Sequence, residues 1–343
     1  MVYLTSHSTF NALKNSAIIT LPRAKLTRSS IVTYDYLIDR LPRSDRQKAT
    51  EGNLSIQEVD GFLSTKAKRR LKAVVNTFTS AMDLVRYKPR NWVTGKKPYI
   101  ALITLTLSAA QTHTDLFVKR HFLNSFLIFL KTKHKVVNYI WRAEPQENGN
   151  IHFHIVVDAF VEWRLIRDEW NEIQARHGYI DKFEAKHGHR HPNSTDIHKP
   201  EDIKNMGAYI CKYISKAGNY RAIQGRLWGC SDQLRKVVPF AKFIDTKLAN
   251  LITTGTTKQL LREFKGDKFT VYVGNVFKLI KGYCKCLYKE IYEHYVQIFE
   301  NLQQIAAKQS KRTENPKTRA SPLFIGFQTV FDFSSVSLSY AKV

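Results

Sequence analysis

The chain has 343 residues, which is enough for two or three domains and a sizeable buried core. It carries 54 Lys and Arg against 29 Asp and Glu, a formal net charge of +25, while 43% of its residues are hydrophobic and 12% aromatic. This apolar content disfavours intrinsic disorder, and the charge indicates a folded protein that binds a polyanion, with nucleic acid as the leading candidate.

The sequence shows no sign of secretion, membrane insertion or nucleotide hydrolysis. Its four cysteines contain no Cys-x-x-Cys pair, and the longest apolar stretches, such as residues 99–107, are far shorter than the roughly 18 residues of a membrane span. Arg90 stands where a phosphate-binding loop ending in Gly95-Lys96 would need its first glycine. We therefore expect a reduced, cytoplasmic protein with no membrane partner.

Residues 1–97 form a basic, partly helical N-terminal region. Its clearest element is a helix over residues 64–85, whose apolar side chains recur at helical spacing. Five basic residues lie in its first turns, where the helix dipole disfavours positive charge. They either form a solvated face or contact DNA.

Residues 98–240 alternate between strand and helix patterns. The expected elements are a strand at 99–107, a helix at 115–134 capped by Asp115, strands at 136–143 and 151–160, a helix at 162–176, a basic histidine-rich loop or short strand at 178–191, a strand at 194–198 and a helix at 199–216. The short turn around Gly149 predicts that the second and third strands pair as a hairpin. The order predicts an α+β fold with a central antiparallel sheet and packed helices.

Residues 241–343 are predicted to be an accessory C-terminal region. A helix near 246–264, a strand near 269–276 and a helix near 283–308 precede a basic tail. The two flanking regions are thus expected to be mainly helical.

The first chemical motif is the strand Ile151-His152-Phe153-His154. Side chains two apart on a strand share a face, so both imidazoles are roughly 6.8 Å apart at the backbone and can bind one metal ion. Across the hairpin, antiparallel pairing would bring Glu144 beside them. Two histidines and a carboxylate suit Mg²⁺ or Mn²⁺ in a phosphoryl-transfer site, although a pair of ordinary half-buried histidines is the alternative.

The second motif places Tyr209, Lys212, Tyr213 and Lys216 on one stripe of a helix. A free phenol titrates near pH 10, and neighbouring ammonium groups favour the phenolate, so the stripe would activate the tyrosines as nucleophiles. The alternative is two amphipathic tyrosines at a helix boundary with solvated lysines.

Together these motifs, with the strand residues 103–107 before them, resemble the three ordered motifs of HUH-family rolling-circle replication initiators, most closely the two-tyrosine type of small single-stranded DNA phages and related plasmids. The resemblance covers roughly residues 98–240. It implies an RRM-like or ferredoxin-like sheet, His152 and His154 as metal ligands with Glu144 in the place of the third, Tyr209 and Tyr213 as nucleophiles, and Lys212 and Lys216 as phosphate contacts.

The resemblance also implies an activity and partners. The activity is nicking and rejoining of single-stranded DNA through a 5′-phosphotyrosyl bond, at an origin hairpin and with a host helicase and polymerase in a bacterial cell. Three alternatives remain open: a transposase or a mobilisation relaxase of the same superfamily, and a non-catalytic basic nucleic-acid-binding protein. A histidine-triad nucleotide hydrolase is disfavoured, because Val156 stands where a third histidine is needed.

Overall fold

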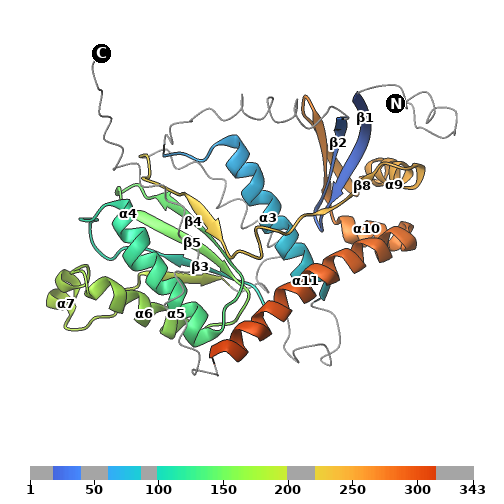
Figure 1. Ribbon diagram of the computed structural model, residues 1–343. Coiled ribbons are helices and arrows are strands. Elements are labelled where there is room, and N and C mark those ends of the chain that lie inside the picture. Colours follow the sequence, from blue (N-terminus) through green and yellow to red (C-terminus); the bar gives the residue numbers. More distant parts are fainter. Residues whose placement is uncertain (1–17, 40–60, 86–98, 199–220, 314–343) are drawn as a thin grey trace, which may run out of the picture.

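The computed structural model describes residues 18–39, 61–85, 99–198 and 221–313 (Figure 1). Within these ranges the chain forms two five-stranded antiparallel sheets, each with helices packed on it. The strand orders are β6-β3-β5-β4-β7 in the first sheet and β8-β1-β2-β10-β9 in the second. The architecture confirms the α+β class that the alternation of patterns predicts.

The first sheet is built from the middle of the chain. Its strands are β3 (Ala101–Leu105), β4 (Tyr139–Pro145), β5 (Ile151–Val157), β6 (Thr195–His198) and β7 (Trp228–Cys230). The predicted hairpin is present: β4 and β5 pair antiparallel, and Gly149 in their turn has a φ of 83°, which glycine adopts without strain. The register sets Glu144 opposite His152 and Arg142 opposite His154.

Helices cover one face of this sheet. They are α4 (Asp115–Phe117), the π-helix η2 (Val118–Leu123), α5 (Asn124–His134) and α6 (Trp163–Ala175). Phe153 of β5 and Phe126 of α5 both pack on the buried ring of Trp170 in α6, with ring centroids 6.4 and 5.8 Å away. Because side chains alternate along a strand, His152 and His154 point to the opposite face.

Two local expectations for this part of the chain are wrong. Thr114, not Asp115, caps the helix that begins at residue 115: its side-chain oxygen accepts a hydrogen bond from the Phe117 N–H, which leaves Asp115 buried in the first turn. The expected loop or strand at 178–191 contains a short helix, α7 (Asp181–His187). Asp181 and Glu184 in its first turn and Lys186 and His187 in its last turn complement the helix dipole.

The second sheet joins the two ends of the described chain. Its strands are β1 (Ile18–Leu26), β2 (Ser30–Asp39), β8 (Phe240–Phe243), β9 (Leu261–Lys265) and β10 (Phe269–Gly274). The sequence analysis anticipated β10 but missed β1 and β2. It also continued a helix through β9, whereas α9 (Thr246–Thr257) ends before that strand.

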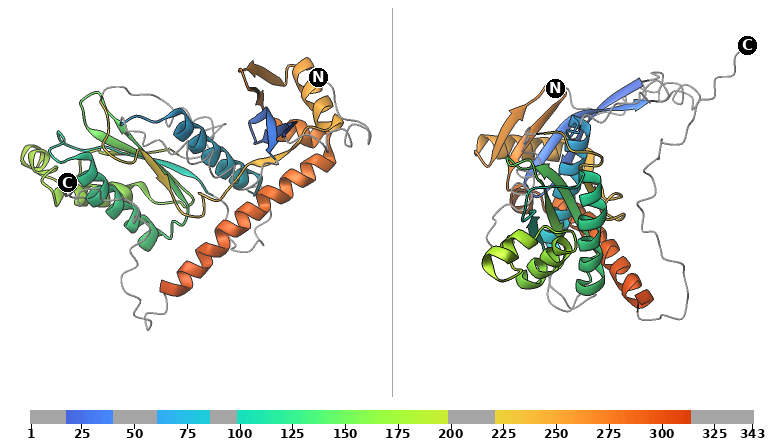
Figure 2. Two further views of the ribbon diagram at one scale, coloured as in Figure 1. Left: turned by 45° about the horizontal axis from the view of Figure 1, so that its top comes forward. Right: turned by 90° about the vertical axis from the view of Figure 1, so that its left-hand side faces the viewer.

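Two long helices connect the sheets. Both α3 (Thr65–Val85) and α11 (Lys285–Thr313) contribute buried side chains to the core of each sheet, and the views of Figure 2 show α11 running from the second sheet towards the first. The remaining helix, α10 (Val276–Tyr283), packs with α9 and α11 in the core of the second sheet. Among the described residues, no helix is long and apolar enough to cross a membrane.

Candidate metal centre and its supporting network

Three side chains on the open face of the β4–β5 hairpin converge on one point. The Oε2 atom of Glu144 lies 3.6 Å from Nε2 of His152 and 3.6 Å from Nε2 of His154. One donor atom from each residue lies within 4.8 Å of the others. The structure thus brings together the three residues that the hairpin pairing predicts as neighbours.

The site is buried and electrostatically tuned. The side chains of Glu144, His152 and His154 are 9%, 17% and 6% exposed. Burial raises the pKa of Glu144, but the two imidazoles and the nearby Arg142 guanidinium outweigh it and hold the pKa at about 2. Glu144 is therefore an anion at neutral pH, as a cation ligand must be.

The donor set fits a divalent cation. Both ring nitrogens of His152 and the Oε1 atom of Glu144 are buried without a hydrogen-bond partner among the described residues. Buried polar atoms are normally paired, so such orphans indicate a missing partner. Two imidazole nitrogens and a carboxylate leave further coordination positions to water and phosphate oxygens, which suits Mn²⁺ or Mg²⁺.

Neighbouring strands orient the ligands. Thr104 on β3 lies opposite His154, and its hydroxyl is 3.1 Å from His154 Nδ1, which turns Nε2 of that ring towards Glu144. On the other side, Arg142 donates from Nη1 to the carbonyl oxygens of Ala143 and Leu227. These contacts fix the positions of the groups around the triad.

A hydrogen-bond network holds the turn that precedes His152. Arg221 forms a bidentate ion pair with buried Asp115, at 2.7 Å for both contacts, and its Nε donates to the Gly149 carbonyl at 2.6 Å. Gln111 donates to Asp115 at 2.8 Å and accepts from the Ile151 N–H at 2.8 Å. The sequence analysis missed this network, because no local pattern links Asp115 to a residue 106 positions away.

The predicted nucleophile helix cannot be placed. Tyr209, Lys212, Tyr213 and Lys216 lie outside the described residues. The positions on either side of that segment are both on the first sheet: His198 ends β6, which pairs with β3, and Arg221 contacts the β4–β5 turn.

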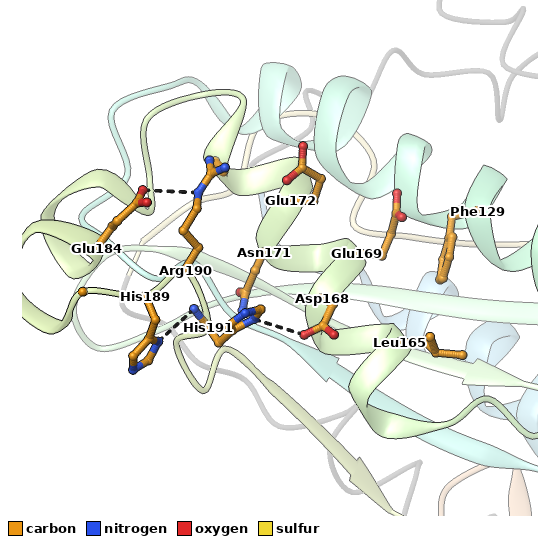
Figure 3. Close-up of a pocket in the computed structure, with 12 residues that line it drawn as sticks. Phe129, Leu165, Asp168, Glu169, Asn171, Glu172, Glu184, His189, Arg190 and His191 are labelled. Atoms are coloured by element: carbon orange, nitrogen blue, oxygen red, sulfur yellow. Dashed lines mark hydrogen bonds and ion pairs between the residues drawn. The ribbon is translucent and has the colours of Figure 1, made fainter.

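The histidine-rich stretch forms a different feature. His189, Arg190 and His191 line a hollow of about 660 Å³ beside α6 (Figure 3). Arg190 pairs with Glu184 at 3.2 Å, and His191 lies 3.3 Å from Asp168, so carboxylates neutralise the basic side chains of this patch. The hollow does not include the triad, and its acidic lining is unsuited to a phosphate backbone.

Comparison with known families agrees with the location of this centre. Residues 100–218 match the family of replication-associated proteins of the ORF2 type. The matched stretch is about a third of the chain and contains the whole triad. No curated protein and no solved structure gives a significant match. The match supports a role in replication initiation and an interaction with DNA.

Proposed function

We propose that this protein initiates rolling-circle DNA replication by nicking and rejoining single-stranded DNA at the Glu144–His152–His154 centre. The observation that carries the proposal is the buried triad of two imidazoles and a carboxylate on adjacent strands. It lies inside the stretch that matches a replication-associated family and that also contains Tyr209 and Tyr213.

The reaction is a reversible exchange of phosphodiester bonds. The phenolic oxygen of Tyr209 or Tyr213 attacks the scissile phosphorus in line and loses its proton to solvent. A bond forms between phosphorus and the tyrosine oxygen, and the bond from phosphorus to the 3′ oxygen breaks, releasing a protonated 3′-hydroxyl. The 5′-phosphotyrosyl product conserves the bond energy, so a 3′-hydroxyl can attack it later and restore the DNA backbone.

The chain's own groups have separate tasks in this scheme. Glu144, His152 and His154 hold a divalent cation, which when bound stabilises the negative charge that develops on the phosphate oxygens. Lys212 and Lys216 contact phosphates or favour the phenolate. With two tyrosines, one can keep a 5′ end while the other cuts a second time.

The test is covalent capture of DNA. Purified protein is incubated with labelled single-stranded DNA and Mn²⁺, and adducts that survive denaturation are measured. We expect an adduct from the wild type, none from the Tyr209→Phe/Tyr213→Phe double variant, and a strongly reduced yield from His152→Ala.

Matched controls remove one residue of the same type elsewhere. Tyr283→Phe alters a tyrosine that is 51% exposed on α10, and His189→Ala alters an exposed histidine outside the triad; both should form the adduct as the wild type does. An adduct that persists in the double tyrosine variant, or that forms equally well in EDTA, would falsify the proposal.

A further inference from the structure

The second sheet has one face that the described helices do not cover. Ala24, Leu26 and Ile31 point into the core formed with α9, α10 and α11. Because side chains alternate along strands, Arg23, Lys25 and the residues paired with them point the other way. We call this side the outer face.

Aromatic rings gather on the outer face. One cross-strand row runs Phe243, Arg23, Tyr34, Phe269 over β8, β1, β2 and β10. Tyr36 lies two positions beyond Tyr34 on β2, on the same face. The exposed fractions of Tyr36, Phe243 and Phe269 are 40%, 45% and 41%. An apolar surface of this kind on a folded protein indicates a binding site.

A second row adds another ring and a second cation. Lys25 pairs with Val32, Val32 with Val271, and Val271 with Phe264 on β9. Phe264 is the most exposed of these rings, at 55%. The outer face therefore presents rings on four of its five strands.

Cations lie among the rings. The Arg23 guanidinium is 4.8 Å from the Tyr36 ring centroid and 5.5 Å from that of Phe243, and the Lys25 ammonium is 4.9 Å from the Tyr34 centroid. The Nε atom of Arg23 is buried without a hydrogen-bond partner among the described residues. These contacts hold positive charge at the level of the rings.

Carboxylates are absent from the two rows, as far as the described strands show. Asp35 pairs with Pro22, and Glu263 pairs with Tyr272, so both acidic residues have the opposite parity and point to the other side of the sheet. The outer face is thus both aromatic and positively charged, which complements bases and phosphates together.

We propose that the outer face of the second sheet binds single-stranded DNA, with bases stacked on its rings and phosphates paired with Arg23 and Lys25. Exposed aromatic side chains interleaved with cations on an open antiparallel sheet are the physical requirement for such binding, since every base has a flat apolar face. This site goes beyond the nicking chemistry and stands or falls independently of it. It would hold a strand at a distance from the triad.

The test is DNA binding by the full chain in EDTA, where metal-dependent nicking cannot contribute. Fluorescence anisotropy with a labelled single-stranded oligonucleotide of mixed sequence gives the Kd. Phe264→Ala and Phe243→Ala should each weaken binding by roughly five- to 150-fold, the loss expected for one stacked base. Phe264→Tyr, which keeps a ring, should bind as the wild type does.

Two controls separate this site from other effects. Phe160→Ala removes a 59% exposed ring near the first sheet and should leave the Kd unchanged. Glu144→Gln, which disables the proposed nicking centre, should also leave it unchanged, so failure of the nicking proposal cannot be mistaken for failure of this one. Circular dichroism confirms that each variant is folded, and Phe264→Leu replaces Phe264→Ala if the latter does not fold.

Crosslinking supplies a direct readout. Irradiation of the complex with 5-iodouracil-containing DNA should crosslink peptides from β1, β2, β8 or β9. Crosslinks confined to the first sheet, or an unchanged Kd in Phe264→Ala and Phe243→Ala, would overturn the proposal. It would also be overturned if these variants changed the oligomeric state in sedimentation without weakening DNA binding, since the face would then bind a second copy of the chain.

Discussion

The Arg221–Asp115 ion pair links the turn before His152 to the chain that follows the tyrosine segment. The Asp115 side chain is 3% exposed and accepts two bonds from Arg221, one from Gln111 and one from the Gln224 N–H at 3.1 Å. Replacing Arg221 with Met keeps an apolar stem but removes two of the four donors. A buried carboxylate then remains without its counter-charge.

The magnitude follows from that burial. Removing one partner of a buried ion pair costs about 3–5 kcal/mol, because the remaining charge is desolvated and unpaired. Arg221 is 30% exposed and water partly replaces it, so we expect Arg221→Met to lower the free energy of unfolding by about 3 kcal/mol. Adding Asp115→Asn should recover part of this loss, since no charge is then left unpaired.

The loss should depend on pH. Burial raises the pKa of Asp115, but hydrogen bonds from Arg221, Gln111 and Gln224 outweigh it and leave the pKa below its ordinary value of 3.8. A carboxyl group with a lowered folded-state pKa stabilises the protein above pH 3.8, and this stabilisation is lost as the pH falls below that value. In Arg221→Met, burial is opposed by fewer donors and the pKa of Asp115 rises. The stability gap between wild type and variant should therefore be largest at neutral pH and narrow as the pH falls through about 4.

Urea unfolding at pH 7 and pH 4, followed by circular dichroism and fluorescence, measures both quantities. Arg176→Met is the matched control: Arg176 forms an exposed i,i+4 pair with Glu172 at 3.5 Å, and its loss should cost less than about 1 kcal/mol. A gap for Arg221→Met no larger than that of the control, or one that stays constant between the two pH values, would refute the assignment of a buried, charge-paired Asp115.

Two further predictions concern the metal centre and the core beneath it. Glu144→Gln should weaken Mn²⁺ binding in calorimetry by more than the roughly 10–100-fold caused by losing an outer-sphere partner, because Glu144 supplies the one negative charge of the triad; equal affinity would exclude it as a ligand. Trp170→Ala should destabilise the fold by about 3–5 kcal/mol in urea unfolding, since Trp170 is fully buried and its Nε1–H donates to the Thr106 carbonyl at 2.8 Å. A loss of less than about 1 kcal/mol would mean that the space it leaves is refilled.

The candidate metal centre was readable from the sequence because its determinants are local. A strand period of two places His152 and His154 on one face, and the short turn at Gly149 sets the register that brings Glu144 opposite His152. All three residues lie within one hairpin, so no long-range contact had to be known. The expectation that α5 and α6 pack on the sheet depends in the same way on a local apolar period.

The second sheet was beyond such reasoning, because its strands come from opposite ends of the chain. Arg23 pairs with Phe243 across 220 positions, and β1 carries Pro22 and charged residues that weaken its strand pattern. Pro22 is tolerated because β8 pairs with β1 only from Arg23 onwards. The aromatic outer face exists only once four strands lie in register.

Local periodicity thus determined which residues share a face of a helix or a strand, and with it the triad. Tertiary structure alone decided which faces meet: Asp115 with Arg221, and the rings of β2, β8, β9 and β10 on one surface. The physical reason is that period and turn chemistry act over a few residues, whereas burial of charge and apolar area selects among pairings of segments far apart in the chain.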